Sequence, residues 1–100
     1  MMNIRKIENS ISFPSPAEFT MQEGLVQGAA IGKKDDFLYV VSPKRYKLFA
    51  DGTNILTVLS GDGFFKWKRG ETKFTTGDVF EISQVGEYEV NGNAQFIVKR

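Results

Sequence analysis

Cysteine and histidine are both absent from the 100-residue sequence. Without cysteine the chain can form no disulfide, no zinc–thiolate site and no thiolate nucleophile, and a cytoplasmic location is the simplest expectation. Without histidine, transition-metal sites lack their usual nitrogen ligand, and acid–base catalysis near neutral pH lacks its usual side chain. The sequence therefore predicts no metal site and no cofactor.

An excess of charge of one sign is also absent, because 13 Lys and Arg residues stand against 12 Asp and Glu residues. Binding to the phosphate backbone of nucleic acids normally needs a marked basic excess, so we expect no nucleic-acid partner. No apolar run approaches the length of about 20 residues that spans a bilayer. The basic residues of the first ten positions are followed by no hydrophobic block, so we expect neither a signal peptide nor a membrane partner.

What the chain does contain is a series of short apolar runs, clearest at 56–82. Turns that combine glycine with polar residues separate these runs: Ser60-Gly61-Asp62-Gly63, Arg69-Gly70-Glu71 and Thr75-Thr76-Gly77-Asp78. Runs this short between such turns are typical of antiparallel strands, and Asn91-Gly92 is a strong hairpin signal. We expect roughly nine to eleven strands in one all-β domain. Residues 1–24 are expected to be an arm or edge strands, and 25–100 the barrel.

Strand alternation sorts the side chains onto two faces. The residues expected inside are Tyr46, Leu48, Leu56, Val58, Phe65, Trp67, Tyr88 and Val90, whereas Lys47, Lys66 and Lys68 are expected outside. Thirteen aromatic residues could fill a small barrel completely, so a packed core and a ligand pocket remain as alternatives. Buried tyrosine hydroxyls and the Trp67 N–H need polar partners, which is the one hint of a polar cavity.

Three phrases of the second half resemble the cupin superfamily of small β-barrels. They are 58–61 (VLSG), 77–82 (GDVFEI) and 86–88 (GEY), the last just before Asn91-Gly92. The resemblance implies a single-domain, RmlC-like jelly-roll barrel of antiparallel strands. The C-terminal barrel of type I mannose-6-phosphate isomerases is similar over the same half.

The metal ligands that the cupin resemblance implies would fall near Leu48, Ala50, Asn54 and Tyr88. None of these is histidine or a carboxylate, so the resemblance is to a cupin without the metal-ligand histidines. Metal-dependent cupin activities, and an RmlC-type epimerase that uses a histidine base, are therefore disfavoured.

Within the superfamily, the chain is similar to the small pyrimidine/purine nucleoside phosphorylase family. The matching segments are 11–15 (ISFPS), Tyr46, 56–61 (LTVLSG), 77–80 (GDVF) and 87–88 (EY), and the chain carries extra residues between 15 and 37. This resemblance implies cleavage of a nucleoside by phosphate, without a cofactor.

Three functions follow as hypotheses, and no catalytic residue is assigned. The first is metal-independent binding of a nucleoside- or sugar-like molecule in the barrel, whose expected lining is Tyr46, Leu48, Asn54, Leu56, Trp67 and Tyr88. The second is nucleoside phosphorolysis, and the third is a structural or interaction protein with a filled barrel. Open sheet edges in the N-terminal arm also predict a homodimer.

Overall fold

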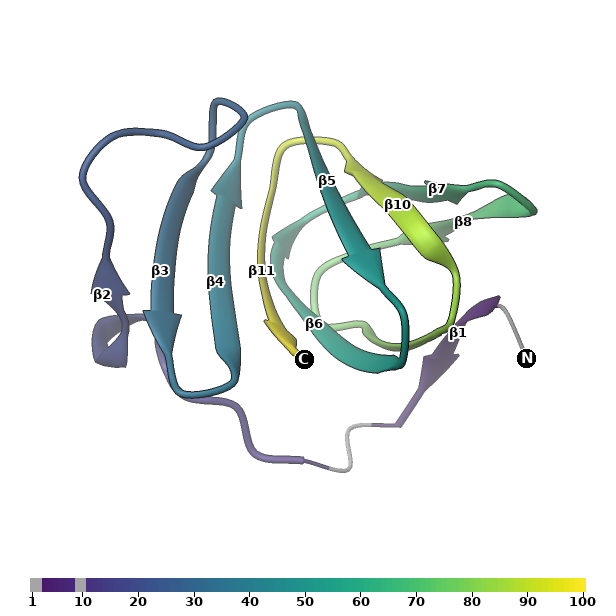
Figure 1. Cartoon of the computed structure of the whole chain (residues 1–100), viewed down its shortest axis with the longest axis horizontal. Helices are drawn as coiled ribbons and strands as arrows, with labels where there is room; N and C mark the ends of the chain where they lie inside the picture. The colour runs from purple at the N-terminus through teal and green to yellow at the C-terminus, as the bar shows by residue number, and fades with distance from the viewer. Residues whose placement is uncertain (1–2, 9–10) are drawn as a thin grey trace.

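The computed structural model describes residues 3–8 and 11–100, and these residues form one all-β unit of two antiparallel sheets (Figure 1). The seven-stranded sheet has the order β1 (Asn3–Ile7), β9 (Val79–Ser83), β6 (Thr53–Gly61), β11 (Ala94–Lys99), β4 (Phe37–Ser42), β3 (Ala30–Lys34) and β2 (Thr20–Met21). The four-stranded sheet has the order β5 (Arg45–Ala50), β10 (Gly86–Asn91), β7 (Gly63–Trp67) and β8 (Gly70–Phe74). The expected number of strands is confirmed. No helix of the described residues is long and apolar enough to cross a membrane.

The chain passes repeatedly from one sheet to the other, as in a jelly roll. β4 belongs to the larger sheet, β5 to the smaller one and β6 to the larger one again, and β9, β10 and β11 repeat this alternation. Strands distant in the sequence therefore become neighbours, as β6 and β11 do. This topology places the inner faces of the two sheets against each other (Figure 1).

The core lies between these inner faces, and the predicted strand alternation is confirmed. All eight residues expected inside belong to it, with Leu48 and Trp67 partly buried and the other six buried. Aromatic rings join the two sheets: Phe65 lies 4.7 Å from Phe80 between ring centroids, and Tyr46 lies 6.2 Å from Phe96. Lys47, Lys66 and Lys68 are exposed, as expected.

Two strands of the N-terminal segment, β1 and β2, lie at opposite edges of the larger sheet. β1 pairs with β9, and β2 pairs with β3 at the opposite edge of the same sheet. Between them, residues 11–13 form no strand. Phe13 packs edge-on against Phe37 at 5.7 Å, and Phe19, just after the 3-10 turn η1 (Pro16–Glu18), packs against Tyr39 at 5.5 Å.

Candidate functional site

The site is built along the free edge of β5, which ends the four-stranded sheet. The side chain of Gln27 is paired with this edge. Its Oε1 accepts the N–H of Lys47 at 2.8 Å, and its Nε2 donates to the carbonyl of Lys47 at 3.0 Å. We call this pair of hydrogen bonds the Gln27 clasp. It ties the loop that leads into β3, in the larger sheet, to a strand of the smaller sheet.

The position of Gln27 follows from a tight turn. Val26 and Ala29 exchange two hydrogen bonds of 2.9 Å, and the two residues between them, Gln27 and Gly28, have φ angles of 54° and 78°. Two consecutive positive φ angles are the geometry of a type I′ turn, for which glycine is well suited at the second position. The turn holds Gln27 beside β5.

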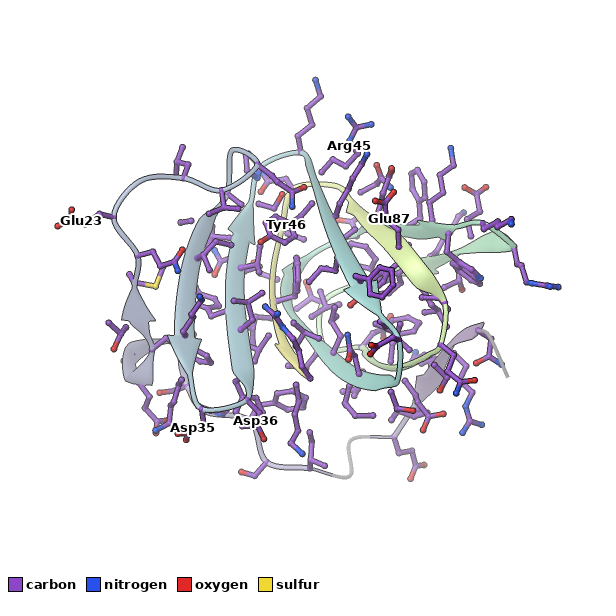
Figure 2. All side chains as sticks on the ribbon, in the orientation of Figure 1. Glu23, Asp35, Asp36, Arg45, Tyr46 and Glu87 are labelled. Atoms are coloured by element: carbon purple, nitrogen blue, oxygen red, sulfur yellow. The ribbon has the colours of Figure 1, made fainter. Side chains whose placement is uncertain are left out.

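Next to the clasp is a hollow of about 480 Å³, which we call the β5 slot. Its lining comes from β4, β5, β10, the Gln27 turn and the residue after β11: Gln27, Leu38, Tyr46, Lys47, Leu48, Phe49, Glu87 and Arg100. Figure 2 shows Tyr46 directed between β5 and β11, whereas the preceding Arg45 points away from the molecule. The slot thus combines apolar walls with a phenol, a carboxylate and two cations, the mixture typical of small-molecule sites.

Arg100 brings a positive charge to this slot. Its main-chain N–H donates to the carbonyl of Asp36 at 3.1 Å, which fixes the end of β11 against the start of β4 (Figure 1). Burial raises the pKa of Tyr46, and the charge of Arg100 partly opposes this increase. Tyr46 therefore remains a neutral hydrogen-bonding hydroxyl at physiological pH, beside a guanidinium that can receive an anion.

Tyr88 and Asn54 form a polar pair in the core. Both are buried, and Nδ2 of Asn54 donates to the Tyr88 hydroxyl at 3.5 Å. Burial raises the pKa of Tyr88 to about 12, although the Asn54 hydrogen bond and the charge of Arg100 act to lower it. The Arg100 charge therefore acts on tyrosines of both β5 and β10.

A second hollow, of about 570 Å³, lies beside the ends of β7 and β10. Its lining consists of Lys66, Trp67, Lys68, Val85, Gly86, Glu87, Tyr88 and Glu89. The indole Nε1 of Trp67 is buried and has no hydrogen-bond partner among the described residues. Lys66 and Lys68 line one side of this hollow and Glu87 and Glu89 the other, so no single charge sign marks it as an anion or cation site.

The six residues predicted as a single lining occupy three places. Tyr46 and Leu48 line the β5 slot, and Trp67 and Tyr88 line the second hollow. On β6, Asn54 and Leu56 are 6% and 0% exposed in the core. Tyr88 connects these places. It accepts a hydrogen bond from Asn54, and it lies directly opposite Leu48 on β5 and Trp67 on β7 in the strand register.

Sequence reasoning missed six of the eight residues that line the β5 slot: Gln27, Leu38, Lys47, Phe49, Glu87 and Arg100. Alternation along β4 would place Leu38 inward together with Val40. Gln27-Gly28 could also have been identified as a turn. No pattern in the sequence indicates that Arg100 lines the slot, because its position depends on β11 ending beside β4 and β5.

The positions at which a cupin would hold its metal do not suit one here. Leu48 and Ala50 offer only hydrocarbon, and the Asn54 amide already donates to the Tyr88 phenol. Three or more His, Cys, Asp or Glu side chains converge nowhere in residues 3–8 and 11–100 closely enough to hold an ion. The β5 slot can instead bind a ligand through hydrogen bonds and the positive charges of Lys47 and Arg100.

No protein-family model and no curated protein matches the sequence. Solved structures do match the fold. A protein of unknown function from Vibrio parahaemolyticus has a TM-score of 0.65 at 13% identity, over 82% of this chain and 97% of that one. Mannose 6-phosphate isomerase from Bacillus subtilis has a TM-score of 0.64 at 16% identity, over 92% of this chain and 31% of that one. The CENP-C cupin domain of Drosophila melanogaster has a TM-score of 0.61 at 16% identity, over 96% and 85%.

These similarities establish a cupin-like fold for this chain, in agreement with the three motifs of its second half. At such low identity they show the fold alone. The neighbours include an isomerase, a cupin domain and a protein of unknown function, so the function must be argued from the site itself.

Proposed function

We propose that this chain is a metal-independent binding domain for a small nucleoside- or sugar-like molecule, which it holds in the β5 slot. The observation that carries the proposal is that Tyr46 and Arg100 line one hollow together with Leu38 and Leu48. The centre of the fold is packed with fully buried side chains such as Phe65 and Phe80, which supports a ligand site at the side of the core.

Each part of the slot has a separate role in binding. Leu38 and Leu48 cover the apolar body of a ligand, which contributes free energy in proportion to the apolar area removed from water. Arg100 binds an anionic group such as a phosphate or carboxylate, with two parallel hydrogen bonds available. Tyr46 donates or accepts one hydrogen bond, and Glu87 accepts bonds from ligand hydroxyls.

The proposal is tested by thermal denaturation with nucleosides, nucleotides, monosaccharides and sugar phosphates. A ligand at tenfold its Kd stabilises the folded state by about 1.4 kcal/mol, which for a domain of this size is a rise in Tm of about 5 °C or more. We expect at least one phosphorylated compound to produce such a rise. Arg100→Gln should remove most of it, whereas Arg69→Gln, which removes an exposed arginine in the turn between β7 and β8, should not. A panel without effect, or an equal loss in both variants, would contradict the proposal.

Nucleoside phosphorolysis is a second candidate, and Arg100 is the observation that favours it. In this reaction an oxygen of phosphate bonds to C1′ of the ribose, while the glycosidic bond breaks and its electron pair leaves with the base. The anionic nucleophile needs a cation, and the departing base needs a hydrogen-bond donor. Arg100 and Tyr46 are available for these two roles in the slot. Release of free base from uridine or inosine only when phosphate is present would establish it, and binding without release would leave the chain a binding domain.

A further inference from the structure

We propose that the ligand of the β5 slot carries an N–H donor beside a carbonyl acceptor, as a lactam or primary amide does, and pairs this edge with the main chain of Phe49. The inference rests on the proposed binding function and specifies the chemical class of the ligand. Gln27 already demonstrates the same interaction within the protein.

The Gln27 clasp shows how the β5 edge receives such a group. The primary amide of Gln27 presents its donor and its acceptor on one side, and both bond to Lys47, at 3.0 and 2.8 Å. The main-chain N–H and C=O of Lys47 must therefore point away from β10. Lys47 and Glu89, which lie opposite each other in the ladder, thus form a pair without mutual hydrogen bonds.

Phe49 offers the same donor and acceptor two residues further along. In an antiparallel ladder the direction of the main-chain groups alternates, so those of Phe49 point to the same side as those of Lys47. The register of β5 with β10 continues without interruption through Phe49, which lies opposite Glu87. In the part of the chain that the structure describes, neither a strand nor a side chain is paired with this side of Phe49. Phe49 also lines the slot, and 65% of its surface is exposed.

Arg100 supplies the second point of attachment. It lines the same slot as Phe49, and its positive charge acts to lower the pKa of Tyr46 in that slot. A ligand that pairs with the main chain of Phe49 and also binds Arg100 has a donor–acceptor edge and an anionic group. Pyrimidine and oxopurine nucleotides have this combination, and so does an acylated amino acid with a side-chain carboxamide. The volume of about 480 Å³ suits a molecule of either kind.

The test compares ligands that differ only at the pairing edge, by isothermal titration calorimetry. Uridine 5′-monophosphate has the N3–H donor beside a carbonyl, whereas 3-methyluridine 5′-monophosphate keeps the phosphate and loses the donor. We expect the methylated compound to bind about tenfold more weakly, because it blocks one hydrogen bond and leaves a peptide carbonyl unpaired. N-acetylglutamine, which has a carboxamide and a carboxylate, tests whether the ligand is an acylated amino acid and not a nucleotide. Preferred binding of either compound supports the inference.

Substitutions at residue 49 test the protein side. Phe49→Ala keeps the main-chain N–H and should preserve the difference in affinity between the two nucleotides. Phe49→Pro removes that N–H at an edge position, where proline is tolerated. This variant should bind the two nucleotides with similar affinity. The comparison of the two nucleotides on the unaltered protein decides the question even where the proline variant does not fold.

The outcomes separate this inference from the function on which it rests. Equal binding of the two nucleotides, both weakened by Arg100→Gln, would leave the β5 slot as the ligand site and overturn the pairing with Phe49. The inference is also overturned if only compounds without a donor–acceptor edge bind. Absence of binding by every compound tested would reject the proposed function and this inference together.

Discussion

Asn54 and Tyr88 join the two sheets through a polar contact in a largely apolar core. The amide Nδ2 of Asn54, on β6, lies 3.5 Å from the hydroxyl of Tyr88, on β10, and both side chains are buried. At this length the hydrogen bond is weak, but each group is the other's polar partner in a region that excludes water.

Replacing Tyr88 with phenylalanine is expected to destabilise the protein by about 1 to 3 kcal/mol, because the buried Asn54 amide loses its partner. Urea denaturation measures this loss. The control is Tyr39→Phe, in which a part-buried hydroxyl loses its 3.0 Å bond to Gln95. Water can reach that site, so the control should lose about 1 kcal/mol or less. Equal losses in the two variants would show that the buried pair has no special importance.

The same tyrosine predicts a loss of stability at alkaline pH. Burial raises the pKa of Tyr88 to about 12, above its value of about 10 in an unfolded chain. The unfolded state therefore ionises first, and the contribution of Tyr88 is complete below pH 10 and is lost as the pH rises to about 12. The expected decrease is roughly 2 to 3 kcal/mol. Urea midpoints between pH 9 and 12 should fall more steeply for the unaltered protein than for Tyr88→Phe, and parallel curves would contradict the assignment.

Asp78 predicts the opposite dependence at acid pH. Burial acts to raise its pKa, but the N–H of Thr75 at 2.9 Å and the ammonium of Lys6 at 3.0 Å outweigh this effect and lower it. Its stabilising contribution is therefore present above about pH 4 and is lost as the pH falls through the lowered pKa. Asp78→Asn should flatten the acid limb of the stability curve. Asp51→Asn, at an exposed turn position, is the control and should leave this limb unchanged.

Gly63 is needed because two turns approach each other closely. A β-carbon at residue 63 would run into the carbonyl oxygen of Asn91 and lie 3.1 Å from the ring of Phe74. Gly63→Ala should therefore destabilise the protein by about 2 to 3 kcal/mol, since backbone on one side and a core ring on the other must move. Gly70→Ala adds the same methyl group where the nearest atom is 3.8 Å away, and it should change the stability by less than about 0.5 kcal/mol. Thermal denaturation of both variants decides between these expectations.

The fold could be predicted from the sequence because its determinants are local. The glycine-containing segments at 60–63, 69–71 and 91–92 mark the places where strands end, although the connections themselves are shorter and fall at 62, 68–69 and 92–93. Alternation from Leu56 to Val90 fixes which side chains meet inside. Phe13 could not be placed from the local sequence pattern, because it lies outside any strand and packs against Phe37 through its ring.

The candidate site could be predicted only in part. Tyr46 and Leu48 were found because alternation along a single strand places them. Arg100 and Gln27 could not be found in this way, since each reaches β5 through the tertiary arrangement of segments distant in the sequence. Alternation also places Asn54, Leu56 and Tyr88 inward without indicating that the centre of the fold is closely packed around them.

The Gln27 clasp offers a test of how the two sheets are held together at the slot. Gln27→Ala removes two hydrogen bonds to the Lys47 main chain, and because the site is exposed and water can replace them, we expect a loss of about 1 kcal/mol. Gln84→Ala is the matched control, since Gln84 is also exposed and has a similar positive φ, 51° against 54°. The cost of alanine in the left-handed region is thus common to both variants, and their difference isolates the clasp. Hydrogen exchange of the Lys47 amide should accelerate only in Gln27→Ala. Unchanged protection of that amide would show that Gln27 does not hold the β5 edge in solution.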